Sequence, residues 1–212
     1  MDARSVLEVA EAATVVARWT DPLGALTASE RARHDRFATD GLRGEFLAAH
    51  LLARECVGQL LAVPAAEVVI GQRCADCGGE HGAPSVLSHA GAHVSWSHSH
   101  GWIGAVAGPG PTGIDIETPR DRDVEPGLLR RTATDAEAAL IMAAPDPRAA
   151  YLQVWVLKEA LIKTGRIALA DFRTTDVSAA LARGAADVLG CRVELHAHPT
   201  VTVGTATVVE ES

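Results

Sequence analysis

The spacing of apolar residues predicts two helices and then three strands in the first half of the chain. Thr27-Ala28-Ser29-Glu30 has the pattern of a capping box, so a helix is expected to begin there and run toward Phe37. Apolar residues recur every three or four positions from Leu42 to Leu60, which predicts a second helix of roughly 20 residues. Short apolar or alternating runs predict strands at residues 68–70, 94–97 and 102–107.

The second half shows helices and strands again. After a turn predicted at Gly108-Pro109-Gly110-Pro111, residues 113–117 form an expected strand. A second capping box, Thr134-Asp135-Ala136-Glu137, precedes a helix toward residue 144, and residues 148–163 have the clearest helical period. Alternation over 192–209 predicts two closing strands. This order predicts an α+β protein with two similar halves, residues 1–109 and 110–212.

The net charge narrows the range of partners. It is -8 at pH 7 over 212 residues, which excludes a general nucleic-acid binder, because such a protein needs a basic face to replace counterions. A single anionic small molecule can still be held by a local cluster of Arg, Lys and helix N-termini. No run approaches the roughly 20 apolar residues of a membrane-spanning helix, and the N-terminus lacks a signal-peptide core. We therefore expect a cytoplasmic protein without nucleic-acid or membrane partners.

Two carboxylates lie two residues apart in the strand expected at 113–117. Asp115 and Glu117 point to one face of that strand because side chains alternate, and they are roughly 6.5 Å apart along it. Both can reach one cation between them, and hard oxygen ligands favour Mg²⁺. The alternative is a half-buried edge strand with a solvated acidic face.

The helix at 148–163 carries Glu159 and Lys163 four residues apart, hence on one helical face. Glu159 could complete a three-carboxylate Mg²⁺ site, and Lys163 could neutralise phosphate charge. The alternative is an ordinary surface ion pair of a helix.

The run Ser95-Trp96-Ser97-His98-Ser99-His100-Gly101 offers hydroxyls and imidazoles at a strand end, which are good donors to phosphate oxygens. It contains no G-x-S-x-G elbow that would present a catalytic serine. A polar loop without function is the alternative.

Cys74 and Cys77, with His81, provide two or three potential zinc ligands. A closed zinc site needs a fourth ligand, which His89 or His93 could supply if the loop folds back. A reduced polar loop is the alternative, since a second Cys-x-x-Cys pair is missing.

Taken together, three motifs resemble the signature set of the 4′-phosphopantetheinyl transferases, especially the longer single-chain group typified by the surfactin-synthetase activator. The resemblance extends from about Leu26 to Phe172 and includes a loop at 81–84. The motifs are Trp96-Ser97-His98-Ser99, Gly113-Ile114-Asp115-Ile116-Glu117 and Trp155-Val156-Leu157-Lys158-Glu159-Ala160-Leu161-Ile162-Lys163.

The resemblance implies a fold and a set of site residues. The fold would be a pseudo-dimer of two α+β halves, with coenzyme A in the cleft between them and its nucleotide end on the N-terminal half. Asp115, Glu117 and Glu159 would hold Mg²⁺ or Mn²⁺, Glu159 would serve as general base, and Lys163 would assist the leaving group. The residues implied to bind coenzyme A are Arg36, Arg43, His81, Gly82, Pro84, Ser97, His98 (on the 3′-phosphate), Asp115, Lys158 and Lys163.

The implied activity is transfer of the 4′-phosphopantetheine moiety of coenzyme A to a serine of an apo acyl or peptidyl carrier protein by a monomer. Gly44 and the segment after Gly165 depart from the family pattern, the first at a phosphate-binding helix and the second at the carrier-facing surface. Two other functions stay open: a Mg²⁺-dependent phosphotransferase acting on another nucleotide, and a non-catalytic coenzyme A or carrier-binding protein with a zinc-stabilised loop. A basic landing patch for the carrier, or merely solvated charges, is expected at Arg120, Arg122, Arg130 and Arg131.

Overall fold

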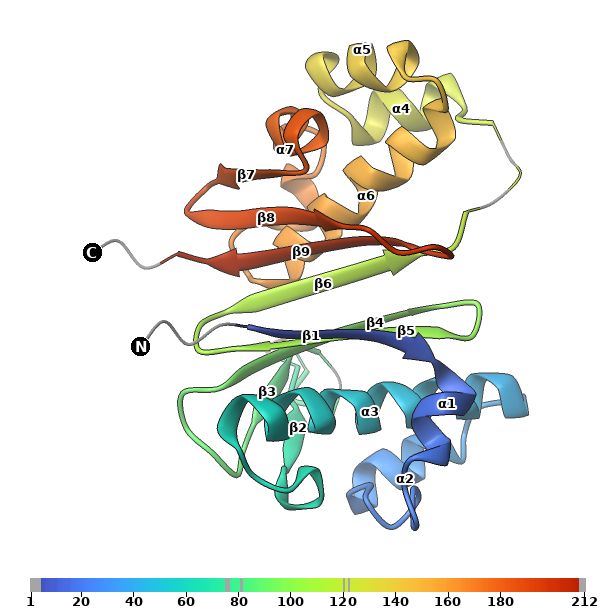
Figure 1. Cartoon of the computed structure of the whole chain (residues 1–212), viewed down its shortest axis with the longest axis vertical. Helices are drawn as coiled ribbons and strands as arrows, with labels where there is room; N and C mark the ends of the chain where they lie inside the picture. Colours follow the sequence, from blue (N-terminus) through green and yellow to red (C-terminus); the bar gives the residue numbers. More distant parts are fainter. Residues whose placement is uncertain (1–4, 75–76, 81, 120, 122, 210–212) are drawn as a thin grey trace. The chain divides into compact units, whose positions relative to one another are not determined.

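The computed structural model describes residues 5–74, 77–80, 82–119, 121 and 123–209. The chain divides into two compact units, Met1–Gly110 and Pro111–Ser212 (Figure 1). Both mix helices and sheet, which confirms the predicted α+β class. Among the described residues, no helix is long and apolar enough to cross a membrane.

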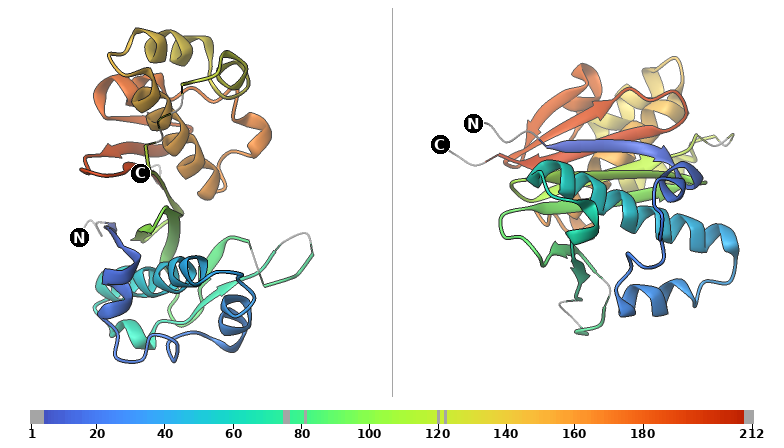
Figure 2. Two further views of the ribbon diagram at one scale, coloured as in Figure 1. Left: turned by 90° about the vertical axis from the view of Figure 1, so that its right-hand side faces the viewer. Right: turned by 60° about the horizontal axis from the view of Figure 1, so that its bottom comes forward.

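The N-terminal unit is built on a three-stranded antiparallel sheet in the order β1-β5-β4. Helix α3 packs against this sheet, and its buried apolar face forms the centre of the core with residues of β4 and β5 (Figure 2). A separate two-stranded sheet pairs β2 with β3. The elements are β1 (Val6–Glu11), α1 (Ala12–Ala17), α2 (Ala28–His34), α3 (Asp40–Leu61), η1 (Ala65–Glu67), β2 (Ile70–Gln72), β3 (Pro84–Val86), β4 (His93–Ser99) and β5 (Trp102–Gly108).

The C-terminal unit has a four-stranded antiparallel sheet in the order β6-β9-β8-β7. Helix α6 packs against β6 and β9, and α4, α5 and α7 complete the core. The elements are β6 (Thr112–Glu117), α4 (Pro126–Thr132), α5 (Asp135–Ala143), α6 (Pro147–Lys163), η2 (Leu169–Asp171), α7 (Ser178–Arg183), β7 (Ala185–Val188), β8 (Cys191–His196) and β9 (Thr202–Val208).

The two units share a strand order. In each, the first strand pairs with the last, and the last pairs with the strand before it. Each also has one long helix, α3 or α6, against the sheet.

Both predicted capping boxes are present, and each contains a carboxylate with a second role. Glu30 receives the backbone N–H of Thr27 and also pairs with the buried Arg54 of α3 at 2.7 Å. Glu137 receives the backbone N–H of Thr134 at 2.7 Å and pairs with Lys158 of α6. A helix start is thus joined to the long helix of its unit in both cases.

The start of one expected strand needs correction. The strand expected at 68–70 begins only at Ile70, because residues 65–67 form a short 3₁₀ helix that carries the chain out of α3. The helix expected from Leu42 to Leu60 is confirmed as α3, which ends at Leu61 through a left-handed residue at Ala62. Strand β1 was not expected from the sequence, although it pairs along its whole length with β5.

Candidate functional site

The close packing of α6 on β6 brings four charged side chains of the C-terminal unit together. Gly113 makes this possible, because a Cβ atom at that position would lie 2.0 Å from the carbonyl oxygen of Ala160. With no side chain between strand and helix, the residues that flank Ala160 on α6 come beside those of β6. Glu159 and Lys163 thereby reach Asp115.

Lys163 bridges the strand and the helix. Its ammonium donates to the Asp115 carboxylate at 2.8 Å and to the carbonyl oxygen of Ile114 at 2.8 Å. Burial raises the pKa of Glu159, and the negative charges of Asp115 and Glu117 raise it further, while Lys163 acts in the opposite direction. The four charged residues therefore form one electrostatic unit.

The donor chemistry of this unit suits a hard divalent cation. Asp115, Glu117 and Glu159 offer only carboxylate oxygens, the ligands that Mg²⁺ prefers, and a cation would relieve the repulsion that raises the pKa of Glu159. Their present arrangement does not form a finished metal site. Among the described residues, no three His, Cys, Asp or Glu side chains are grouped so that they could hold a metal ion, and the ammonium of Lys163 lies on Asp115.

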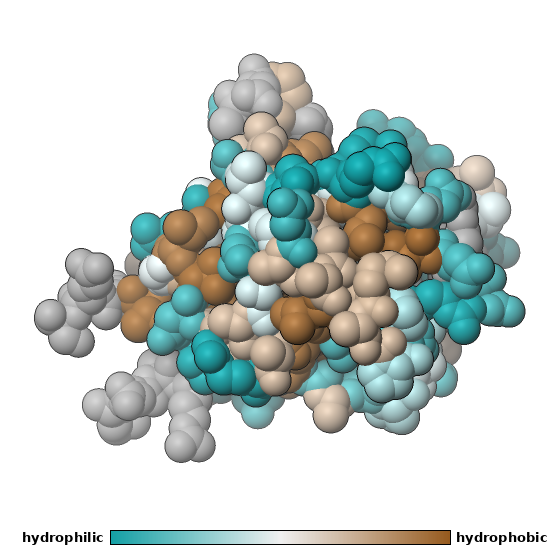
Figure 3. All heavy atoms as spheres, turned by 90° about the horizontal axis from the view of Figure 1, so that it is seen from above, coloured by the Kyte–Doolittle hydropathy of each residue, from teal (hydrophilic) through white to brown (hydrophobic). Residues whose placement is uncertain are grey.

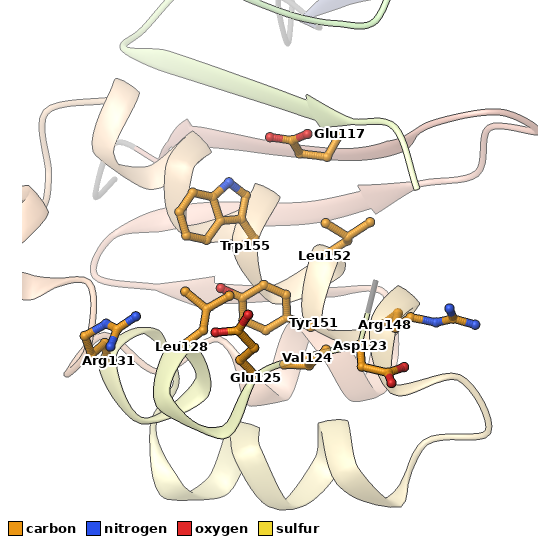
Figure 4. Close-up of a pocket in the computed structure, with 10 residues that line it drawn as sticks. All are labelled: Glu117, Asp123, Val124, Glu125, Leu128, Arg131, Arg148, Tyr151, Leu152 and Trp155. Atoms are coloured by element: carbon orange, nitrogen blue, oxygen red, sulfur yellow. The ribbon is translucent and has the colours of Figure 1, made fainter. Parts of the chain in front are cut away.

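A pocket of about 370 Å³ adjoins this unit and contains Glu117 in its wall (Figure 4). Its apolar lining comes from α6, from α4 and from the segment just before α4, and Trp155 of α6 forms part of the wall (Figure 4). The remaining lining residues are Asp123, Val124, Glu125, Leu128, Arg131, Arg148, Tyr151 and Leu152.

This pocket was not expected from the sequence, although the helical period could have revealed it. Arg148, the adjacent pair Tyr151 and Leu152, and Trp155 follow one another one helical turn apart along α6, and Glu159 is the next member of the same stripe. The pocket wall and the carboxylate site therefore share one face of the helix.

Lys158 does not take the place expected for it. Its side chain is completely buried, and its ammonium donates to the carboxylate of Glu137 at 2.6 Å and to the carbonyl oxygens of Thr132 and Phe172, both at 2.9 Å. These three acceptors use all three ammonium protons. The expected contact between Lys158 and a phosphate is thus not available, and the residue is an internal ion-pair partner.

The residues expected to bind the nucleotide lie on several elements of the N-terminal unit. Arg36 is exposed after α2, whereas Arg43 in the first turns of α3 is already tied to the carbonyl of Phe37 at 2.5 Å and to Asp40 at 2.6 Å. Gly82 precedes β3, which begins at Pro84, and His81 lies outside the described residues.

Ser97 and His98 are neighbours on β4 and therefore point to opposite faces of its sheet. His98 lies on the face covered by α3, where its Nδ1 atom is 3.0 Å from a carboxylate oxygen of Glu45. Glu45 was not singled out from the sequence. It stands directly before Phe46 of the expected apolar face, and the apolar spacing alone does not distinguish it from a solvent-exposed helix residue.

The other expected sites have less structural support. Cys74 is half-buried and Cys77 is exposed, and the third expected zinc ligand, His81, lies outside the described residues. Arg120 and Arg122 of the expected carrier patch are likewise outside the described residues. Arg131 is one of the residues that line the pocket containing Glu117. The backbone carbonyl of Arg130 accepts a hydrogen bond from Arg173.

Residues 111–198 match the family model of the 4′-phosphopantetheinyl transferase superfamily. The match begins at the first residue of the C-terminal unit and includes β6, the pocket and α6, but it covers less than half of the chain. It supports placing the chain in this superfamily. No curated protein sequence matches the chain significantly.

Proposed function

We propose that the chain transfers the 4′-phosphopantetheine moiety of coenzyme A to a serine hydroxyl of an apo acyl or peptidyl carrier protein, with Mg²⁺ as cofactor, as holo-acyl-carrier-protein synthases do. One observation carries this proposal. Asp115, Glu159 and Lys163 are brought together by β6 and α6 within the residues that match the superfamily.

The reaction would form a bond between the serine oxygen and the phosphorus that bears the pantetheine arm. The bond from that phosphorus to the oxygen bridging the two phosphates breaks, and adenosine 3′,5′-bisphosphate leaves. The serine proton would go to Glu159, the carboxylate that α6 places beside Asp115 and Lys163. The ammonium of Lys163 would donate to the leaving phosphate and stabilise its growing charge.

Asp115, Glu117 and Glu159 are the proposed ligands of Mg²⁺ or Mn²⁺. The cation would neutralise charge on the phosphate oxygens of coenzyme A. Before coenzyme A is bound, Lys163 keeps the Asp115 carboxylate neutralised at 2.8 Å. The ammonium of Lys163 would therefore donate either to Asp115 or to the substrate phosphate.

The pocket beside Glu117 suits the pantetheine arm. That arm is a flexible chain of apolar methylene groups and two amides, and the pocket wall presents the rings of Tyr151 and Trp155 with the apolar Leu128 and Leu152. A volume of about 370 Å³ lies at the lower end of the range for small-molecule sites. Its position next to Glu117 would place the start of the arm near the reacting phosphorus.

The N-terminal unit would hold the nucleotide end through Arg36, Arg43, His81, Gly82, Pro84, Ser97 and His98. In this proposal the two units form a pseudo-dimer with coenzyme A in the cleft between them, and the protein works as a cytoplasmic monomer.

The carrier protein would dock beside the pocket mouth on the C-terminal unit. Figure 3 shows the side on which α4 and α5 lie in Figure 1, with apolar side chains in patches separated by polar ones. Leu140 and Met142 are exposed on α5, and Arg130 and Arg131 end α4. These groups could contact an acidic carrier surface with an apolar centre.

The test is intact-mass spectrometry of a panel of apo carriers incubated with coenzyme A and Mg²⁺, with a chelator control. We expect one phosphopantetheine arm to be added, only with metal, and Asp115→Ala to abolish the addition without unfolding the protein. Asp187→Ala is the matched control, because it removes an exposed carboxylate from the opposite edge of the same sheet. Transfer by Asp115→Ala at the wild-type rate would refute the proposed site.

A further inference from the structure

The tip of the β4–β5 hairpin is fixed by one carboxylate of helix α3. Glu45 accepts the backbone N–H of Gly101 at 2.6 Å through one oxygen, and its other oxygen lies 3.0 Å from Nδ1 of His98. Glu45 is 18% exposed and His98 is 50% exposed. The carboxylate is thus largely enclosed, while the imidazole reaches the surface.

The surroundings hold this pair in place. The two-residue turn, His100-Gly101, has positive φ angles of 48° and 82°, which is typical of a tight hairpin. The carbonyl of Gly101 also accepts the N–H of Ala12 at 2.8 Å. Thr39 caps α3 by accepting the N–H of Leu42, so the helix turn that carries Glu45 begins at a defined point.

The chemistry of a carboxylate at Nδ1 decides what the other ring nitrogen offers. An imidazole whose Nδ1–H donates to a carboxylate is held in one orientation, and the carboxylate stabilises the protonated ring. In that ring Nε2 also carries a proton. With Nδ1 of His98 engaged by Glu45, Nε2 is the ring atom left for a ligand, and a ring that carries both protons binds a phosphate oxygen strongly.

We propose that Glu45 is a positioning residue that holds His98 in the orientation that recognises the 3′-phosphate of the ribose, so that the N-terminal unit selects coenzyme A over its 3′-dephosphorylated form. This inference rests on the proposed function. It goes beyond it by assigning the selection to a residue that would not contact the substrate.

Glu45→Gln is the decisive variant, because the amide keeps the shape of the side chain and a hydrogen-bonding group for Gly101 but loses the charge. Glu67→Gln is the matched control, since Glu67 is exposed on η1 of the same unit. We expect Glu45→Gln to raise the KM for coenzyme A by roughly tenfold, the effect of losing one charge-assisted contact. The kcat, and the KM for 3′-dephospho-coenzyme A, should stay within about twofold of wild type.

Binding measured by calorimetry makes the test independent of transfer activity. Wild-type protein should bind adenosine 3′,5′-bisphosphate more tightly than adenosine 5′-monophosphate, and Glu45→Gln should reduce this preference. In a His98→Ala background, Glu45→Gln should change the preference no further.

Equal weakening of both ligands by Glu45→Gln, an unchanged preference, or an equal additional loss in the His98→Ala background would overturn the inference. If the wild-type protein transfers no phosphopantetheine but shows the preference and its dependence on Glu45, the proposed function fails while this inference stands.

Discussion

Replacing Lys158 with Met should lower the unfolding free energy of the C-terminal unit by about 3–5 kcal/mol, because it leaves the buried Glu137 carboxylate without its positive partner. Lys158 and Glu137 are both completely buried, and the ammonium donates to three acceptors at 2.6–2.9 Å. Hydrogen bonds to charged groups contribute roughly 1.5–3 kcal/mol each. Burial removes the ammonium from water and lowers the pKa of Lys158, while Glu137 acts in the opposite direction. This desolvation cost offsets part of the free energy that the three hydrogen bonds contribute.

The variant leaves the Glu137 carboxylate without its cation, although Glu137 still accepts the N–H groups of Thr134 and Val177. Lys158→Met combined with Glu137→Gln should therefore regain at least half of the lost stability, since the buried charge is removed together with its partner. Urea unfolding followed by circular dichroism measures both variants. At a typical urea m-value of about 2 kcal/mol/M, the single variant should lower the midpoint by roughly 2 M.

The same variant separates two roles for this lysine. A phosphate-binding Lys158 would give a Met variant with an unchanged urea midpoint and a raised KM for coenzyme A. That result would refute the assignment of Lys158 to the interior.

Two more predictions follow from packing and from ionisation. Gly113→Ala should destabilise the protein by about 2–3 kcal/mol in thermal unfolding, because the new Cβ would lie 2.0 Å from a carbonyl oxygen of α6. The control is Gly44→Ala, which should be neutral or slightly stabilising because no atom lies within 4 Å of its new Cβ. Equal losses of stability in the two variants would contradict the packing argument. Burial would raise the pKa of Glu30, but the hydrogen bond from His50 and the charge of Arg54 lower it to about 2. Its ionised form therefore stabilises the fold above the unfolded pKa, and up to about 3 kcal/mol should be lost as pH falls from about 5 to 2. Glu30→Gln, compared with wild type in acid titrations of unfolding, should lack this part of the pH dependence; an unchanged acid profile would show that Glu30 is not the group responsible.

Elements with strong local signals were predictable from the sequence. Both capping boxes start helices where the Thr and Glu residues predicted them, because their hydrogen bonds are satisfied within four residues. Strand β1 was not predictable in this way. Its order of residues, Val6-Leu7-Glu8-Val9-Ala10-Glu11, has no clear alternation, and only pairing with β5, about 90 residues later, makes it a strand.

The Trp155–Lys163 motif does not predict where the side chain of each of its two lysines lies. Lys163 lies at the carboxylate site, whereas Lys158 is internal. Position within the helical period distinguishes them, since Lys158 falls on the stripe of buried Val154 and Leu161. The motif alone could not show this, and neither could it identify the acceptors for Lys158, which come from segments 132–137 and 172.

The double role of the capping carboxylates has a consequence for local opening of the chain. Glu137 in the first turn of α5 accepts the N–H of Thr134 and pairs with Lys158 of α6. If the start of α5 unfolded locally, the Lys158 ammonium would lose its carboxylate partner or become exposed to water. Amide protons at the start of a helix usually exchange quickly with solvent, because nothing beyond the helix holds them. Here the capping-box amides of Thr134 and Glu137, which are both hydrogen-bonded, should exchange as slowly as those in the centre of α6, and the two helices should open together as one cooperative unit.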